Sequence, residues 1–129
     1  MKTIIQTMLA AMMGVVTVTA IAQQYPTKPV RMLVGIAPGG GLDTGTRTVA
    51  GKLSELLGQP FIVENRPGGG GTIAAAAAAK AAPDGYILLM ATTTIMIHPS
   101  VYANLPYDPI KDFTPIGAAG TEVLVISVH

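Results

Sequence analysis

The chain has 129 residues, of which half are apolar and 12% are charged, and its formal net charge is +1 at pH 7. This length allows one domain at most, and so small a net charge does not favour binding to nucleic acid or to acidic lipid. The absence of cysteine excludes disulfides, thiolate metal sites, cysteine nucleophiles and a lipobox cysteine.

The first 22 residues have the pattern of a secretory signal peptide. A short basic start, Met1-Lys2-Thr3, precedes a mostly apolar stretch over 8–18, and Ala20-Ile21-Ala22 forms an A-x-A cleavage site. The apolar stretch is short for a membrane-spanning helix, and an uncleaved membrane anchor is the alternative. We therefore expect residues 1–22 to be removed after Ala22 and residues 23–129 to be periplasmic.

Three short strands alternate with two helices in the predicted secondary structure. The expected strands cover 30–36, 61–65 and 86–90, and the expected helices run to about Leu57 and over about 72–82. The first strand is apolar nearly throughout, which is typical of a strand covered on both faces. Asp43 stands where the first helix would have its N-cap, and Thr72 where the second would have its own. This order predicts an α/β fold, a parallel βαβαβ sheet with helices on both faces.

The remaining segments predict packing and connections. Six consecutive alanines, Ala74–Ala79, predict a helix that lies very close to the sheet. Residues 95–109 contain three prolines and predict a surface connection with about one helical turn. Residues 113–118 predict a further short strand, and 123–128 form a strongly β-forming run. An apolar strand at a chain end would be an unprotected edge, so we expect more chain to belong after His129.

The carboxyl ends of the three strands form the expected ligand-binding edge, because parallel sheets bind ligands there. These ends are 38–43, 65–71 and 92–94. The first leads through glycines into a helix start, whose N–H groups can receive a carboxylate; a purely structural glycine turn is the alternative. At the second end, a ligand contact by Arg66 and a solvated turn are both open. The three threonines at the third offer hydroxyls, or cap the next turn.

The sequence contains no recognisable catalytic set or metal-binding loop. His98 and Ser100 are too close in the chain for an oriented triad, and we expect His98 to be a surface loop residue. Gly39-x-Gly41 matches a dinucleotide fingerprint only in part, since Thr44 takes the third small position; Glu64 stands where a ribose-binding acid would be. A nucleotide-binding βαβ enzyme domain is therefore the alternative function.

Several longer motifs follow one another through the mature chain. They include Tyr25-Pro26-x-Lys28-Pro29-Val30-Arg31, Ala37-Pro38-Gly39-Gly40-Gly41-x-Asp43, Val63-Glu64-Asn65-Arg66-Pro67-Gly68, Ala81-Ala82-Pro83-Asp84-Gly85-Tyr86 and Leu105-Pro106-Tyr107-Asp108-Pro109. In this set the chain resembles the periplasmic solute-binding receptors of tripartite tricarboxylate transporters, often called Bug receptors. The family usually has bulkier and polar residues at Ala74–Ala79.

The resemblance implies a type II periplasmic-binding-protein fold, in which two lobes close on a small carboxylate and the receptor delivers it to a membrane permease. It implies a monomer without enzymatic activity, cofactor or nucleic-acid partner. The implied ligand-binding positions are Ala37, Pro38, Gly39, Gly40, Gly41, Asp43, Thr92, Thr93 and Thr94, with Asp43 orienting its loop. Family chains are more than twice as long, so residues 23–129 would be a partial first lobe without the second; a non-functional truncated remnant is the further alternative.

Overall fold

The structure, a computed structural model, describes residues 24–121, in which strands and helices alternate. In chain order the elements are β1 (Val30–Val34), α2 (Gly41–Leu57), β2 (Phe61–Asn65), the 3-10 turn η1 (Gly69–Gly71), α3 (Thr72–Ala79), β3 (Ile87–Met90) and α4 (Thr94–Val101). The predicted order of three strands and two intervening helices is therefore confirmed. The predicted signal peptide and the 123–128 run lie outside the described residues.

The three strands form one parallel sheet in the order β2-β1-β3. Val30 is opposite Phe61 on one side of β1, and Met32 is opposite Leu88 on the other. Because β1 is the central strand, four of its five residues are buried. This position explains the near-continuous apolar run, since side chains on both faces of a central parallel strand meet other protein groups.

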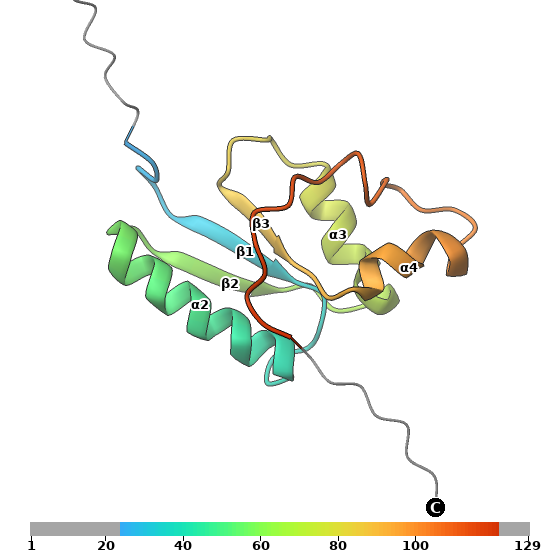
Figure 1. Ribbon diagram of the computed structural model, residues 1–129, viewed down its shortest axis with the longest axis horizontal. Coiled ribbons are helices and arrows are strands. Elements are labelled where there is room, and N and C mark those ends of the chain that lie inside the picture. Colours follow the sequence, from blue (N-terminus) through green and yellow to red (C-terminus); the bar gives the residue numbers. More distant parts are fainter. Residues whose placement is uncertain (1–23, 122–129) are drawn as a thin grey trace, which may run out of the picture.

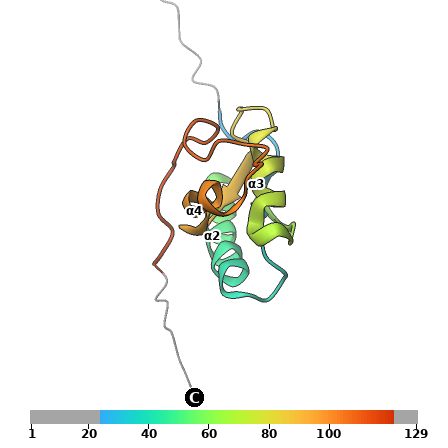
Figure 2. The same ribbon diagram turned by 90° about the vertical axis from the view of Figure 1, so that its right-hand side faces the viewer.

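The two crossover helices cover opposite faces of the sheet (Figures 1 and 2). The chain moves from β1 to one neighbour, β2, through α2, and then past β1 to the other neighbour, β3, through α3. Right-handed crossovers made in opposite directions place their helices on opposite faces. Accordingly, α2 packs on β1 and β2, whereas α3 packs on β1 and β3. The α/β fold with helices on both faces is confirmed.

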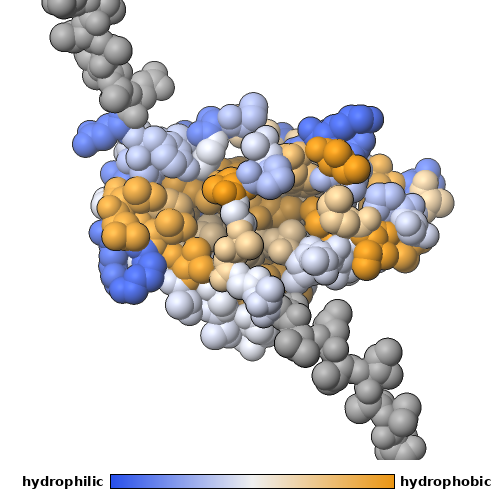
Figure 3. Space-filling model, viewed as in Figure 1, coloured by the Kyte–Doolittle hydropathy of each residue, from blue (hydrophilic) through white to orange (hydrophobic). Residues whose placement is uncertain are grey.

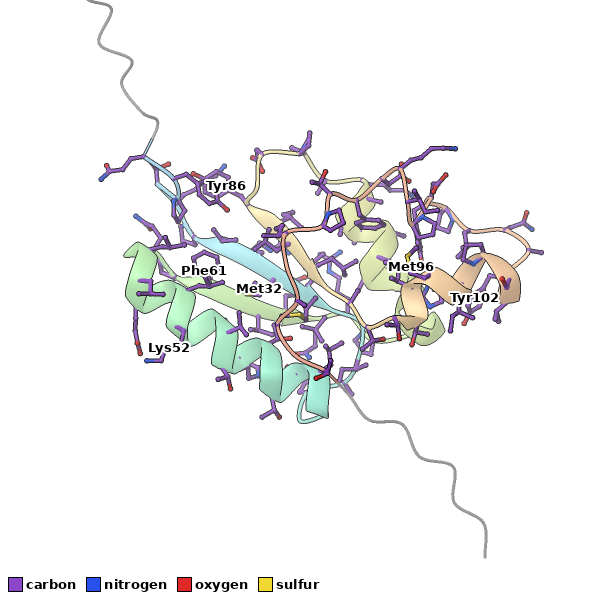
Figure 4. All side chains as sticks on the ribbon, in the orientation of Figure 1. Met32, Lys52, Phe61, Tyr86, Met96 and Tyr102 are labelled. Atoms are coloured by element: carbon purple, nitrogen blue, oxygen red, sulfur yellow. The ribbon has the colours of Figure 1, made fainter. Side chains whose placement is uncertain are left out.

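The main core lies between the sheet and α2. Val30, Met32 and Phe61 point from the strands toward Ala50 of the helix, and the labelled Met32 and Phe61 are seen on that side in Figure 4. On the other face Ala74 and Ala75 of α3 are buried. Small side chains there let the helix lie close to the sheet, as the alanine run predicts.

Two predicted helix caps are wrong. Gly40 is the N-cap of α2, and Asp43 is the third residue inside the helix. Gly71, in a left-handed conformation, precedes α3, and Thr72 makes no side-chain capping bond. Gly71 adopts its left-handed conformation because it has no side chain. Gly40 has an extended backbone, and the Asp43 side chain instead accepts a bond from the Gly39 N–H ahead of the helix.

The predictions for the segment after β3 are partly wrong. Instead of about one helical turn, α4 spans eight residues with Pro99 inside it. Residues 113–118 form no strand within the described part of the chain; they run as irregular backbone across the α2 side of the sheet (Figure 1). Strand propensity depends on an available pairing partner, which local sequence does not reveal.

The surface around this framework is partly apolar. Leu56 at the end of α2 and Ile97 and Val101 of α4 are exposed, and the space-filling view shows apolar side chains gathered near both helices (Figure 3). Among residues 24–121, no helix combines the length and hydropathy needed to cross a bilayer.

Candidate functional site

A pocket of about 260 Å³ opens at the carboxyl ends of the strands. Its wall is made by residues 35–36, 41–42, 70–71, 75, 89–92, 94–95 and 98. These segments include the end of β3 and residues that follow β1, β2 and β3, so the prediction that the three strand ends share one rim is confirmed. Ligand pockets usually measure about 300–1,000 Å³, so this one suits a small solute.

The pocket lies between the ends of β1 and β3, and strand order explains why it forms there. From the central β1 the chain turns toward β2, whereas β3 lies on the other side of β1. Connections that diverge from neighbouring strands leave a crevice at their carboxyl ends. Gly35 and Ile36 continue β1 into this crevice, and Met90 and Ala91 enter it from β3.

The first glycine turn contributes the start of α2 to the pocket wall. Gly41 and Leu42 line the pocket, whereas Ala37, Pro38 and Gly39 are exposed and lie outside its wall. The first N–H groups of a helix have no carbonyl partner in a preceding turn, so they are available to an acceptor. Gly40, half-buried, is the residue that leads into this start.

Asp43 is buried below the turn and does not line the pocket. One carboxylate oxygen accepts bonds from the Gly39 N–H at 2.9 Å and the Arg47 Nε at 3.0 Å, and the other accepts one from the Asn65 Nδ2 at 2.8 Å. The Arg47 guanidinium, together with the Gly39 and Asn65 donors, lowers the pKa of Asp43 well below its usual range. The carboxylate therefore holds the turn after β1 in place.

Asn65 joins this network to the end of β2. Its side-chain amide also donates to the Ile36 carbonyl at 3.1 Å, and its side-chain oxygen accepts a bond from Arg47 at 3.0 Å. The segment leaving β1 is thus tied to the neighbouring strand as well as to α2. Sequence reasoning did not single out Asn65 or Arg47, although Arg47 lies four residues after Asp43, a spacing that brings side chains together on a helix.

The third strand end contributes two of its three threonines. Thr92 and Thr94 line the pocket, whereas Thr93 is exposed and lies outside its wall. The Thr92 hydroxyl donates to the Thr94 hydroxyl oxygen at 3.0 Å. The proton of Thr94 is therefore free to point to another acceptor.

His98 lines the pocket, and the prediction of a surface loop residue is wrong. The side chain belongs to α4 and is only 4% exposed. Its Nδ1 lies 2.5 Å from the Tyr107 hydroxyl, and its ring packs edge-on against Tyr102, which Figure 4 labels at the end of α4. The four-residue spacing from Thr94 places both residues on one helix face, but this signal is lost when the segment is interpreted as a connection.

Glu64 and Arg66 have structural partners outside the pocket wall. The Glu64 carboxylate accepts bonds from the Arg31 Nε at 2.9 Å and from the Arg66 Nε at 2.7 Å, and these guanidinium donors lower the pKa of Glu64. A carboxylate held by two arginines is poorly placed to receive a ribose hydroxyl. The second glycine turn instead contributes backbone at Gly70 and Gly71.

The chemistry of the pocket wall suits an anion more than a cation. Its residues include no aspartate and no glutamate, and its polar side chains are Thr92, Thr94 and His98. Within residues 24–121, no cluster of three histidine or acidic side chains could hold a metal ion. A solute would therefore meet hydroxyls, the imidazole and helix-start N–H groups.

Comparison with known proteins identifies relatives across most of the chain. A sequence description of the tripartite tricarboxylate transporter family receptor matches residues 46–129. Protein BugT of Bordetella pertussis is 37% identical over 128 residues, which cover 93% of this chain and 39% of BugT. The chain spans between 33% and 39% of the length of this and two further curated relatives.

Solved structures share the fold of the described residues. The periplasmic binding protein BugD matches with a TM-score of 0.70 and 42% identity, over 72% of this chain and 31% of BugD. MatC from Rhodopseudomonas palustris, solved with bound malate, matches with a TM-score of 0.64 and 39% identity, over 70% of this chain and 31% of MatC. An R. palustris protein with adipate matches with a TM-score of 0.63 and 40% identity, over 66% of this chain and 29% of that protein.

Proposed function

Because the chain belongs to the receptor family of tripartite tricarboxylate transporters, we propose that it forms the part of a periplasmic solute-binding receptor that holds one carboxylate of a small dicarboxylic acid. The family resemblance seen in the sequence motifs is thereby confirmed. The observation that carries the proposal is the pocket between β1 and β3, where a helix start and a threonine hydroxyl face a wall without acidic side chains. The malate and adipate in two similar structures support the ligand class.

The predicted site residues take different roles in this proposal. Gly41 and its neighbour Leu42 offer N–H groups at the positive end of α2. Thr94 donates its hydroxyl to a carboxylate oxygen, because Thr92 already supplies a proton to the Thr94 oxygen. Asp43 acts on the ligand only through the turn that it holds.

The four residues before α2 and the remaining threonine lie outside the pocket wall. We assign Ala37, Pro38, Gly39 and Gly40 to the mouth of the site, beside the start of α2. Thr93 stands at the N-cap of α4, between the two lining threonines. These five remain predicted ligand-binding positions, and their contacts would form only when a solute and a second lobe are present.

The remaining expectations concern the receptor as a whole. The family is one of solute-binding receptors, and we propose that this chain too binds its solute without converting it. Residues 23–129 would be a partial first lobe, and a second lobe and a membrane permease would complete the transport function of a monomeric receptor. We propose export with cleavage after Ala22; a mature protein whose first residue by Edman sequencing is not Gln23 would contradict that position.

Isothermal titration calorimetry tests the binding function. The mature product of the whole gene is titrated with malate, with adipate and with the uncharged diamides of the same diacids. We expect binding of at least one diacid and none of its diamide, since the site is built to receive a charged oxygen. A protein that binds neither diacid, or binds diamides equally well, would contradict the proposal.

Two threonine variants locate the site within the same experiment. Thr94→Val removes a hydroxyl from the pocket wall at nearly constant shape, and a lost hydrogen bond to a charged group costs about 1.5–3 kcal/mol, or about tenfold or more in affinity. Thr48→Val is the matched control, because this exposed threonine of α2 does not line the pocket. Equal effects of the two substitutions would count against the assigned location.

The nucleotide-binding alternative is tested by adding NAD to the titrations. The ion pairs of Glu64 with Arg31 and Arg66 occupy the carboxylate that would hold the ribose. We therefore expect no heat of binding with NAD. A measurable affinity for NAD, without affinity for diacids, would favour the alternative.

A further inference from the structure

A buried nitrogen of His98 has no hydrogen-bond partner in the structure of residues 24–121. This atom is Nε2, and its residue is only 4% exposed. Buried polar atoms are nearly always paired, because an unpaired one loses its bonds to water without replacement. An unpaired atom in a pocket wall therefore indicates a missing partner, and the pocket is where that partner can be.

Nε2 lies beside the second glycine turn of the pocket wall. His98 and Thr94 line the same pocket from one face of α4, and Gly70 lines it from the second glycine turn. A Cβ atom added to Gly70 would lie 3.9 Å from Nε2 and 3.2 Å from the Tyr102 hydroxyl. A side chain at Gly70 would thus extend toward Nε2 and the Tyr102 hydroxyl.

The hydrogen bond at the other ring nitrogen, Nδ1, determines whether Nε2 carries a hydrogen. Nδ1 lies 2.5 Å from the hydroxyl of Tyr107, a residue that is 7% exposed. Burial raises the pKa of Tyr107, so the hydroxyl keeps its proton and needs an acceptor. The lone pair of Nδ1 provides that acceptor, and a neutral imidazole then carries its hydrogen on Nε2. His98 therefore presents a donor to the pocket.

The chain beyond α4 holds Tyr107 in this position. Asp108 accepts bonds from the N–H groups of Ile110 and Lys111 at 2.9 and 3.1 Å, and Asp112 accepts one from the N–H of Asp108 at 2.7 Å. This turn brings Phe113 edge-on to Tyr107, with ring centroids 5.8 Å apart. The motif around residues 105–113 thus places the Tyr107 hydroxyl against Nδ1 of the imidazole.

We propose that His98 is a ligand-binding residue whose Nε2–H donates a hydrogen bond to a carboxylate oxygen of the solute. Tyr107 is its positioning residue, because its hydroxyl fixes the imidazole in the form that carries this hydrogen. The assignment rests on the proposed function, since it requires a diacid in the pocket. It adds a side-chain contact from α4 to those from the glycine turn and from Thr94.

Two substitutions that replace different ring nitrogens of His98 test the hydrogen bond from Nε2 to the solute. In the mature product of the whole gene, His98→Asn keeps a polar group near the position of Nδ1 but does not reach the pocket. His98→Gln places an amide N–H near the position of Nε2; it is combined with Tyr107→Phe so that no buried hydroxyl is left unpaired. We expect H98N to weaken malate or adipate binding about 10- to 100-fold, and the Gln/Phe pair to retain most of the affinity.

The outcomes separate the two proposals. Wild-type protein that binds neither diacid overturns the proposed function and the His98 assignment with it. Wild-type binding that H98N leaves unchanged overturns the His98 assignment alone. Thermal unfolding followed by circular dichroism establishes that the variants are folded before their affinities are compared.

The ¹⁵N spectrum of the His98 imidazole tests the assignment, first in the wild-type protein and then in one variant. We expect a protonated Nε2 and an unprotonated Nδ1, with the Nε2 signal shifting when diacid saturates the protein. In Tyr107→Phe we expect the two tautomers to mix, which a merely structural role of Tyr107 would not cause. A hydrogen on Nδ1, or a Nε2 signal that diacid leaves unchanged, would overturn the assignment.

Discussion

Asp43 shows how a residue can be near a site and serve it indirectly. Its carboxylate receives hydrogen bonds from a backbone N–H, an arginine and an asparagine, and the residue is only 2% exposed. Those bonds join the turn after β1 to α2 and to the end of β2. The position of the Gly41 and Leu42 N–H groups therefore depends on a charge that a solute need not touch.

We expect the stability of the protein to fall as acid protonates Asp43. The folded state lowers the pKa of this residue, so the stabilisation is present above the unfolded value of about 4 and is lost as pH falls from there toward the lower folded value. Asp43→Asn should lower the free energy of unfolding at pH 7. It should also make the free energy of unfolding fall less steeply below pH 4. Urea unfolding at several pH values measures both effects.

The control for this prediction is Glu55→Gln. This substitution also removes one carboxylate, but from an exposed ion pair with Lys52 on α2, whose side chains are 65% and 71% exposed. Exposed pairs contribute little to stability. A D43N protein that unfolds with the same pH profile as wild type would show that the network does not hold the turn.

His98 illustrates which residue-level properties sequence alone could not give. Its burial depends on Tyr107, which lies nine residues later and reaches back to Nδ1. Three prolines nearby favoured a connection over a helix, although α4 accommodates Pro99 inside it. A lone histidine in such a segment is more often exposed, and only the packing of the following turn reveals otherwise.

At the scale of elements, the approach of β1 to the start of α3 depends on glycine. A Cβ atom added to Gly35 would lie 2.6 Å from the Gly71 Cα, a distance that real side chains do not reach. Gly71 itself has a φ of 101°, which favours glycine. This close crossing brings the second glycine turn beside the end of β1, where both line the pocket.

We predict opposite effects of one substitution at two glycines. Gly35→Ala should destabilise the protein by about 1–3 kcal/mol, because the added methyl group would force two backbones apart. Gly51→Ala should stabilise it by about 1 kcal/mol, since its Cβ meets nothing within 4 Å and alanine favours the interior of α2. Urea unfolding at neutral pH measures both; a G35A protein as stable as wild type would contradict the close crossing.

The elements differ in how well sequence predicted them. The 61–65 strand matches β2 at both ends, and the central strand begins at Val30 as expected but ends at Val34 rather than residue 36. Apolar runs beside glycine turns and prolines are strong local signals. The predicted strand at 113–118 fails because a strand requires a neighbour, and the described chain offers it none.

For the whole molecule, the parallel strand order brings motifs that are distant in sequence together at one pocket. Three glycine- or threonine-rich ends separated by up to about 50 residues in the sequence meet because every strand is parallel. That meeting could be predicted from the order of elements. The wall formed by α4 could not, because it is positioned by the turn at 108–112 and its aromatic neighbours.

The amino-terminal ends of the strands lie away from the pocket and can be compared with the carboxyl ends. At the amino-terminal ends the Tyr25 hydroxyl donates to the Gly85 carbonyl at 2.5 Å, and the Val30 N–H donates to the Pro60 carbonyl at 2.9 Å. The segments that enter the strands are thus tied together away from the pocket. A solute held at the carboxyl ends should leave their local motions unchanged.

Hydrogen exchange at short labelling times tests this polarity, because loop amides exchange by local opening. Addition of saturating malate or adipate to the mature product of the whole gene should slow exchange at 41–42, 70–71 and 92–94. Amides at 27–28 and 84–85, which precede β1 and β3 at the amino-terminal ends of the strands, should exchange at their original rates.

Because the two ends belong to the same strands, a general rise in stability would slow exchange at both. Protection confined to the amino-terminal ends would place the solute at the wrong end of the sheet. Equal protection of both ends would remove the support for a site between β1 and β3.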